Sequence, residues 1–230
     1  MVIAIDGPAG TGKSTIAMML AENLRGEDNK PFTYINSGNL YRAITLGCLR
    51  KGIPFSEDKK VLEYAKTAPL AYKGGKLHLH EEMVECLLHS DEVDKYVSPL
   101  SAIVPVRHVV NDIVRKLAAG LNAVVEGRDM TTVVFPAAKY RFYLDASIEE
   151  RARRRFEQGT SKLNTEEIQK AIAERDSIDR NKTEGSLFVG EDVHYLDTSD
   201  LTLMQVYDTL LIRLQKVRKN NGSDGSGNGH

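Results

Sequence analysis

A glycine-rich loop near the N-terminus constrains the fold of this chain more than any other feature. It lies between an apolar run, Val2–Asp6, and apolar residues at helical spacing, Ile16, Leu20 and Leu24. The loop fits the pattern G-x-x-x-x-G-K-[ST] in the strand–loop–helix setting that this pattern requires. Its residues are Gly7, Pro8, Ala9, Gly10, Thr11, Gly12, Lys13 and Ser14. A buried strand followed by such a loop and a helix opens an α/β fold.

The chemistry of this loop explains why these residue types are needed. Glycines allow backbone N–H groups to converge on a phosphate beside the positive end of the following helix. We expect Lys13 to reach the β and γ oxygens of a nucleoside triphosphate and Ser14 to ligate Mg²⁺. The motif therefore predicts a nucleotide-binding phosphate loop, and it leaves open which class of phosphate-loop protein this is.

Composition excludes several classes of protein. The chain has 230 residues, 41% of them hydrophobic, so one domain can bury its own core. Lys and Arg number 31 against 32 Asp and Glu, so bulk attraction to nucleic acid or anionic membranes is not expected. Two cysteines without a CxxC motif exclude a disulfide framework and a Cys-rich zinc site. No apolar run approaches about 18 residues and no secretory signal is visible, so we expect a cytoplasmic protein.

Apolar patterns and turn signals predict the remaining elements. Strands are expected at residues 33–35, 123–125 and 140–144, and helices at residues 40–49, 164–179, 202–216 and in a segment capped by Ser147. Apolar runs at 77–80 and 83–87, preceded by a turn at 73–76, predict a small antiparallel insert. A helix from Pro99 to Leu117 is expected to be kinked by Pro105. The Gly-, Ser- and Asn-rich end, residues 220–230, is expected to be disordered.

Basic residues gather in the segments that follow the loop. The ligand crevice of an open parallel sheet lies at the carboxyl ends of its strands, so Arg128 and Asp129 should point into it. Two phosphorylated ligands that meet end to end need more cations than one nucleotide does, because phosphoryl transfer depends on positioning and charge stabilisation. We therefore infer a kinase with a phosphorylated acceptor. The basic residues are Arg42, Arg107, Arg128, Arg151, Arg153, Arg154, Arg155, Arg175, Arg180 and Lys182.

Several segments together resemble the bacterial-type cytidylate (CMP/dCMP) kinases, a family of P-loop nucleoside monophosphate kinases. They follow the family's order over nearly all of residues 1–219 and read IDGPAGTGKST, SGNLYRA, VSPLSAIVPVR, VVEGRDMTTVVFP, YLDASIEERARRR, ERDSIDRNK and YLDTSDLT. The resemblance implies one kinase domain with a three-layer α/β/α P-loop NTPase fold and a parallel core sheet. It also implies a small CMP-binding insert near residues 66–98 and a helical lid near residues 153–182.

The resemblance also implies a set of site residues. ATP would be the phosphoryl donor, bound with Mg²⁺ by residues 7–15, the last of which is Thr15. The residues implied to bind CMP are Ser37, Arg107 and Asp129 at the base, Arg42 and Arg128 at the phosphate, Ser98, Arg175 and Asp179 near the pentose, and Lys182. The residues implied to be catalytic are Lys13, Arg128, Arg151, Arg153 and Arg155.

Two positions depart from the family pattern. Asn36 stands where the family usually has Asp, which removes a charge beside the base site. Lys182 stands where the family usually has Arg, which keeps the positive charge but loses the fork geometry. Both departures bear on acceptor binding more than on the type of reaction.

Other interpretations stay open at this point. The chain could be another small P-loop kinase that acts on UMP, AMP or a shikimate-like acceptor, or a nucleotide-binding regulator without turnover. The arginines of the segment 153–155 could form a solvated helix face with Glu149 and Glu150, and Arg175 could form a surface ion pair with Asp179. On the leading interpretation, the partners are ATP and CMP or dCMP, with no nucleic acid or membrane, and the protein is a monomer.

Overall fold

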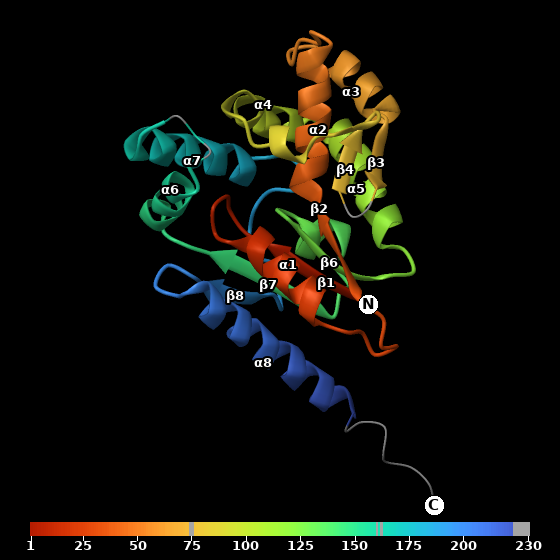
Figure 1. Ribbon diagram of the computed structural model, residues 1–230, viewed down its shortest axis with the longest axis vertical. Helices are drawn as coiled ribbons and strands as arrows, with labels where there is room; N and C mark the ends of the chain where they lie inside the picture. The colour runs from red at the N-terminus through yellow and green to blue at the C-terminus, as the bar shows by residue number, and fades with distance from the viewer. Residues whose placement is uncertain (74–75, 160, 162, 223–230) are drawn as a thin grey trace, which may run out of the picture.

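A five-stranded parallel sheet forms the centre of the computed structural model, which describes residues 1–73, 76–159, 161 and 163–222 (Figure 1). Its strand order is β2-β6-β1-β7-β8. The strands are Val2–Asp6 (β1), Phe32–Asn36 (β2), Asn122–Gly127 (β6), Tyr140–Asp145 (β7) and His194–Asp197 (β8). All four pairings are parallel, so the carboxyl ends of the strands lie at one edge. The predicted α/β fold is confirmed, although β8 has no counterpart among the predicted strands.

Helices cover both faces of this sheet because β1 and its neighbours alternate their side chains between two cores. Ile3 and Ile5 pack in one cluster with residues of α1 (Lys13–Asn23) and α8 (Leu203–Gly222). Figure 1 shows these two helices on the same side of the sheet. Ala4 belongs to the other cluster, which contains residues of α2 (Ser37–Arg50) and α5 (Val104–Ala118). This layering holds the carboxyl ends of the strands in fixed positions.

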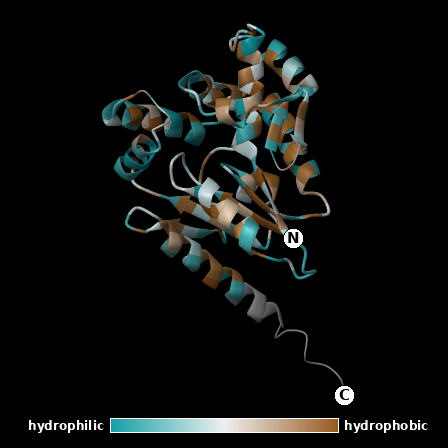
Figure 2. Cartoon of the chain, in the orientation of Figure 1, coloured by the Kyte–Doolittle hydropathy of each residue, from teal (hydrophilic) through white to brown (hydrophobic). Residues whose placement is uncertain are grey.

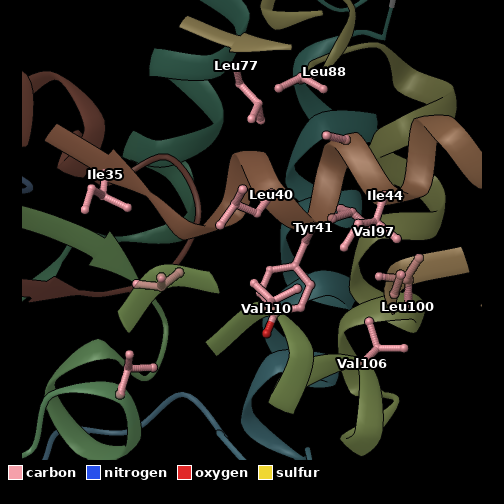
Figure 3. Close-up of a cluster of buried hydrophobic side chains, with 14 of the residues drawn as sticks. Ile35, Leu40, Tyr41, Ile44, Leu77, Leu88, Val97, Leu100, Val106 and Val110 are labelled. Atoms are coloured by element: carbon pink, nitrogen blue, oxygen red, sulfur yellow. The ribbon is translucent and has the colours of Figure 1, made fainter. Parts of the chain in front are cut away.

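An insert above the second core carries the predicted antiparallel strands. Its elements are α3 (Asp58–Thr67), β3 (Leu70–Lys73), β4 (Lys76–Leu79), β5 (Glu82–Met83), the 3₁₀ helix η1 (Glu85–Leu87) and α4 (Asp91–Ala102). The antiparallel order β3-β4-β5 is confirmed, and Gly74 and Gly75 of the predicted turn lie outside the described residues. Figure 3 shows Leu77 and Leu88 of the insert beside the α2 helix, so the insert shares the core of the main body.

Two local predictions are wrong. The run 83–87 predicts a strand, but β5 ends at Met83, because the backbone of Val84 turns to a helical conformation (φ −106°, ψ −1°) and leads into η1. A single kinked helix over 99–117 is also wrong, since α4 and α5 are separate helices on either side of the extended residue Ile103. Pro105 lies in the first turn of α5, where its missing N–H removes no intrahelical hydrogen bond.

The helical pair α6 (Ile148–Glu157) and α7 (Thr165–Arg180) projects beside the sheet (Figure 1). Figure 2 shows that hydrophilic residues dominate both helices, and only a small cluster, Ala152, Ile168 and Ile172, packs between them. Ser147 caps α6 as predicted, and Asn164 caps α7. A pair with so small a core can shift relative to the sheet at low cost, which suits the lid that the sequence implies.

The C-terminal helix extends beyond the end that the sequence predicts. Helix α8 continues to Gly222, and residues 223–230 of the predicted tail lie outside the described residues. Among the helices of the described segments, none is both long and apolar enough for a bilayer crossing.

Candidate active site

The phosphate loop adopts the conformation that its glycines permit. Gly7, Gly10 and Gly12 have positive φ angles of 143°, 83° and 88°. A Cβ on Gly7 would lie 1.9 Å from the Leu144 carbonyl oxygen in β7, so the loop passes too close to this strand for any side chain. The loop therefore follows β1 directly and leads into α1, as the motif predicts.

The side chain of Lys13 is folded over this loop. Its Nζ donates to the Pro8 carbonyl oxygen at 2.5 Å and to Thr11 Oγ1 at 3.3 Å. Burial, together with repulsion from Arg128, lowers the pKa of Lys13 to about 7. An anion in the loop would favour the charged ammonium. Ser14, in the first turn of α1, is exposed, so its hydroxyl is accessible to a ligand.

Two carboxylates lie at the carboxyl ends of neighbouring central strands. Asp6 ends β1 and accepts hydrogen bonds from the Thr131 N–H at 2.7 Å and from Thr131 Oγ1 at 2.6 Å, and burial raises its pKa to about 6. Glu126 in β6 accepts from Tyr34 Oη at 2.5 Å and from Asn36 Nδ2 at 2.8 Å. The Asn36 departure thus gives Glu126 a hydrogen-bond donor. Asp6 also fixes the start of the π-helical turn η2 (Met130–Val134), directly after Asp129.

The predicted base-reading pair is in direct contact. Arg107 of α5 donates through Nη2 to Asp129 Oδ2, and each side chain is only 2% exposed. The Arg107 Nη1 donates to the Ser101 carbonyl oxygen at 2.9 Å, and its guanidinium lies 5.8 Å from the centre of the Tyr41 ring. Tyr41 is labelled in Figure 3, where it reaches from α2 toward α5. The pair is therefore held firmly by its contacts with the Ser101 carbonyl and the Tyr41 ring.

A loop that follows α7 covers this pair. Gly185 has a φ of 64°, and a Cβ there would lie 2.1 Å from Arg107 Nη2 and 2.3 Å from Asp129 Oδ2. The absence of a side chain at position 185 therefore lets this loop lie directly against the pair. Several buried polar atoms nearby have no hydrogen-bond partner within the described part of the chain: Ser98 Oγ, Tyr41 Oη and Arg107 Nε. Such atoms are rare in folded proteins, so their concentration here points to a ligand.

Asp179, near the end of α7, binds two cations of the predicted acceptor site. Its Oδ2 accepts from Arg128 Nε at 2.9 Å, and its Oδ1 accepts from Lys182 Nζ at 2.6 Å. Arg175 Nε lies 4.0 Å from Asp179 Oδ2. Burial opposes ionisation of Asp179, but the surrounding cations outweigh it and hold its pKa well below the ordinary range. Lys182 also donates to Ser101 Oγ at 2.8 Å, so it lies within the cluster and not on the surface.

Asp94, in the first turn of α4, binds three more arginines. Its Oδ1 accepts from Arg42 Nη2 of α2 at 2.5 Å and from Arg175 Nη1 of α7 at 3.4 Å. Its Oδ2 accepts from Arg155 Nη2 of α6 at 2.8 Å. Burial opposes ionisation of Asp94, and the three guanidiniums lower its pKa in spite of it. Burial and the nearness of Arg42 and Arg128 in turn lower the pKa of Arg175 to about 10, which reflects the crowding of positive charge.

The structure thus brings most of the predicted acceptor residues together, whereas two of the predicted catalytic arginines lie elsewhere. The Arg153 side chain is 55% exposed on α6 and pairs with Glu150 at 2.7 Å and Glu157 at 2.5 Å, not with the carboxylates of this cluster. Arg151 is buried behind the phosphate loop, where its Nη1 donates to the Ala9 carbonyl oxygen at 3.2 Å. It also pairs with Asp176 of α7 at 2.7 Å, and so links the loop to the lid. Ser37, at the start of α2, donates to the Glu126 carbonyl oxygen at 2.8 Å.

Four residues of this region are absent from the set that the sequence predicts: Asp6, Tyr34, Asp94 and Glu126. Asp94 lies four residues, or about one helical turn, before the predicted site residue Ser98 in α4. A predicted helix that began before residue 94, and not at Pro99, would have placed both residues on one face and so indicated Asp94. Asp6 and Glu126 end apolar strand patterns at the edge where ligands bind, which is a usable signal. Tyr34 carries no comparable signal.

The donor groups present suit Mg²⁺ bound together with a nucleotide. No cluster of three or more His, Cys, Asp or Glu side chains able to hold a metal ion occurs in the described segments. Mg²⁺ commonly takes few protein ligands and relies on phosphate oxygens and water. The accessible Ser14 hydroxyl at the phosphate loop fits this mode of binding.

Comparison with known proteins identifies the family of this chain. The profile of the family described as "Cytidylate kinase" matches residues 3–216. A cytidylate kinase from Caldanaerobacter subterraneus subsp. tengcongensis is 39% identical over 95% of this chain and 95% of its own length. A cytidylate kinase from Fusobacterium nucleatum subsp. nucleatum is 36% identical over 95% of this chain and 99% of its own length. Among solved structures, a gluconokinase from Sinorhizobium meliloti 1021 is 14% identical, with a TM-score of 0.49 over 97% of each chain. The chain belongs to the cytidylate kinase family.

Proposed function

We propose that this protein transfers the γ-phosphoryl group of ATP to CMP or dCMP, giving ADP and CDP or dCDP. The observation that carries the proposal is the cluster of buried and half-buried arginines around Asp94 and Asp179, together with the buried Arg107–Asp129 pair. The first feature suits a phosphorylated acceptor, and the second suits recognition of a polar base. The identity to cytidylate kinases over nearly the whole chain supports the same substrates.

On the donor side, the phosphate loop binds the triphosphate of ATP. Backbone N–H groups of the loop and of the start of α1 face the phosphates. The Lys13 ammonium, which donates to the Pro8 carbonyl in the free protein, then donates to phosphate oxygens instead. Mg²⁺ would be held by the Ser14 hydroxyl and by the phosphates, and it would neutralise part of their charge when bound. Arg151 keeps the loop connected to α7 through Ala9 and Asp176, so donor binding and lid position are linked.

On the acceptor side, the Arg107–Asp129 pair reads the base. An aspartate accepts from the exocyclic amine of cytosine, and an arginine donates to its ring N3 and O2. Uracil presents a donor at N3 and an acceptor at O4, so the same pair rejects it. Ser37 and Ser98 supply hydroxyls beside the base and the pentose. Arg42 and Arg128 hold the acceptor phosphate, as the resemblance implies. We add Arg175, which the resemblance places near the pentose, because its guanidinium shares Asp94 Oδ1 with Arg42. Asp179 and Lys182 fix the position of Arg128 and of the pentose.

The reaction needs no general base on the protein. An oxygen of the acceptor phosphate is already ionised, and it attacks the γ-phosphorus in line as the bond to the β-phosphate oxygen breaks. Lys13, Arg128 and the lid residue Arg155 stabilise the charge that spreads over the transferring group. Closure of α6 and α7 excludes water, which limits hydrolysis of ATP.

A coupled assay of ADP release across CMP, dCMP, UMP, AMP and shikimate tests the proposal. We expect rapid turnover with CMP or dCMP and slow turnover with UMP, because the base-reading pair rejects uracil. Turnover of UMP or AMP equal to that of CMP would contradict the assignment of cytosine. Activity with shikimate but not with CMP would show that the arginines bind a carboxylate acceptor instead. Tight CMP binding without phosphoryl transfer would favour a regulator.

The proposal extends to the setting in which the enzyme works. We infer a monomer that acts in the cytoplasm on small molecules and not on nucleic acid, and the net charge of −1 supports the last point. Light scattering on a size-exclusion column tests the oligomeric state. A dimer in dilute solution would contradict it.

A further inference from the structure

We infer that Asp94 is a positioning residue that occupies the acceptor-phosphate arginines until the acceptor displaces it. This inference rests on the proposed function, because it takes Arg42 and Arg175 as the groups that receive the phosphate of CMP. Asp94 is not part of the set of residues that the family resemblance implies. Its role is argued from its contacts in the structure alone.

One carboxylate accepts hydrogen bonds from guanidiniums on three separate elements: Arg42 on α2, Arg155 on α6 and Arg175 on α7. Both oxygens take part, at 2.5, 2.8 and 3.4 Å. A carboxylate and a phosphate both present oxygens that accept from guanidinium forks. Asp94 therefore makes the kind of contacts that a phosphate would make with the same arginines.

The cations around Asp94 outnumber the carboxylates that bind them. Three cations share a single carboxylate, and the Asp179 carboxylate nearby is already bound by Arg128 and Lys182. The cluster thus keeps an excess of positive charge, and the Nε of Arg175 has no hydrogen-bond partner within the described segments. A phosphate with two negative charges satisfies these groups better than Asp94 does. A substrate phosphate at Arg42 and Arg175 would repel the carboxylate or replace it.

Asp94 also joins the insert to both helices of the lid. The Arg155 contact joins α6 to α4, and the Arg175 contact joins α7 to α4. In the ligand-free protein, Asp94 therefore ties both lid helices to the insert and keeps the arginines assembled in the absence of substrate. When the acceptor phosphate displaces the Asp94 carboxylate from Arg42 and Arg175, the carboxylate also moves away from Arg155, whose tie to α4 is lost. Arg155 then becomes available to the phosphoryl group that is being transferred.

Replacement of Asp94 tests this role by calorimetric titration with CMP in the absence of ATP. In Asp94→Asn, the competing charge is gone, so we expect CMP to bind about threefold to tenfold more tightly than in the wild type. The KM for CMP should also be lower in Asp94→Asn than in the wild type, while kcat stays equal or decreases. Asp94→Glu keeps the charge and should remain close to the wild type. Asp91→Asn is the matched control, because Asp91 lies in the same helical turn, is exposed and accepts only from Ser161 in the described segments.

A merely structural role predicts the opposite sign. If Asp94 only held the insert together, Asp94→Asn would bind CMP more weakly and melt at a lower temperature. Unchanged or weaker binding of CMP by a folded Asp94→Asn protein overturns the inference. Asp94→Ser serves if the Asn variant does not fold, with the same expected tightening. Failure of the wild type to bind or turn over CMP would contradict the proposed function itself, so the two failures are distinguishable.

Inhibition by inorganic phosphate gives a second measurement. Phosphate lacks the base and pentose, so it reports on the arginines without contributions from Asp129 or Ser98. We expect phosphate to inhibit Asp94→Asn at about threefold to tenfold lower concentration than the wild type, competitively with CMP. Equal inhibition of both proteins would mean that Asp94 does not compete for the phosphate position.

Discussion

The donor and acceptor sides of the active site are built in different ways. The donor side is one continuous stretch, residues 7–15, and its shape follows from three glycines and the strand before them. The acceptor side is assembled from α2, α4, α5, α6, α7 and the end of β6, and it contains its own carboxylates. A local motif binds a ligand with groups that are fixed by the backbone. A composite site must offset the repulsion among the cations that it brings together, and here Asp94, Asp129 and Asp179 do so.

Loss of the phosphate clamp should produce the largest effect on turnover. In Lys13→Ala, no ammonium stabilises the charge on the transferring group, so we expect kcat to fall about 100-fold to 1000-fold. Steady-state kinetics with CMP measures this fall. Lys30→Ala, which removes an exposed lysine paired with Asp28, is the control and should leave kcat unchanged. A Lys13→Ala enzyme with nearly full activity would mean that the donor side does not depend on its motif.

Removal of one member of the buried base-reading pair should cost both stability and acceptor binding. Asp129→Asn leaves the Arg107 charge buried without its partner, so we expect the free energy of unfolding to fall by about 3 kcal/mol. CMP binding should weaken by about 1–3 kcal/mol. Urea denaturation and calorimetry measure the two effects.

Asp112→Asn is the control for this prediction. Asp112 forms an exposed pair with Arg115, so its replacement should change stability by less than about 0.5 kcal/mol. A destabilised Asp129→Asn protein that binds CMP as the wild type does would make the pair purely structural. The acceptor side would then read its base elsewhere.

The same contrast explains what the sequence could predict. The phosphate loop was predictable residue by residue, because glycine, lysine and serine act there through the local backbone. The central strands were predictable because parallel strands buried on both faces read as apolar runs, as at residues 123–125. Arg128 and Asp129 were predictable because they follow such a run at the ligand edge of the sheet.

The remaining features depend on contacts between distant segments. Asp94 gains its role only when α2, α6 and α7 come together around α4, and no local pattern encodes that meeting. Pro105 begins a helix instead of kinking one because the chain has already turned at Ile103. Arg153 and Arg155 occur in the same run of arginines and cannot be told apart from the sequence. The packing of α6 leaves Arg153 exposed to solvent and places Arg155 in contact with Asp94.

Nucleotide binding should take up protons at alkaline pH. Burial lowers the pKa of Lys13 to about 7, so at about pH 8 the side chain is largely neutral in the free protein. A bound diphosphate favours the charged form of Lys13 and raises its pKa, so at about pH 8 Lys13 must take up a proton when the nucleotide binds. At about pH 5.5 Lys13 is charged both before and after binding, so it takes up no proton. Calorimetric titration with ADP in buffers of different ionisation enthalpy measures the uptake.

Lys13→Arg provides the control for proton uptake, because a guanidinium stays charged across this range. The variant should show no buffer dependence from this position. Wild-type binding without uptake at about pH 8 would mean that Lys13 is already charged in the free protein. The Pro8 and Thr11 contacts would then compensate for its burial, and the donor side would be charged before the nucleotide arrives.

The smallest effect on kcat and KM is expected for the replacement of Arg153. This replacement tests whether Arg153 belongs to the acceptor side of the site. Its exposed pairs with Glu150 and Glu157 lie on the outer face of α6, so Arg153→Gln should change kcat and KM by less than about twofold. Arg155→Gln, two residues along the same helix, should alter both constants more because Arg155 contacts Asp94. A fall in kcat of more than about tenfold for Arg153→Gln would reverse the ranking, since removal of a solvated ion pair cannot produce it. In that case α6 must rotate during lid closure, and Arg153 would reach the phosphoryl group as the family resemblance implies.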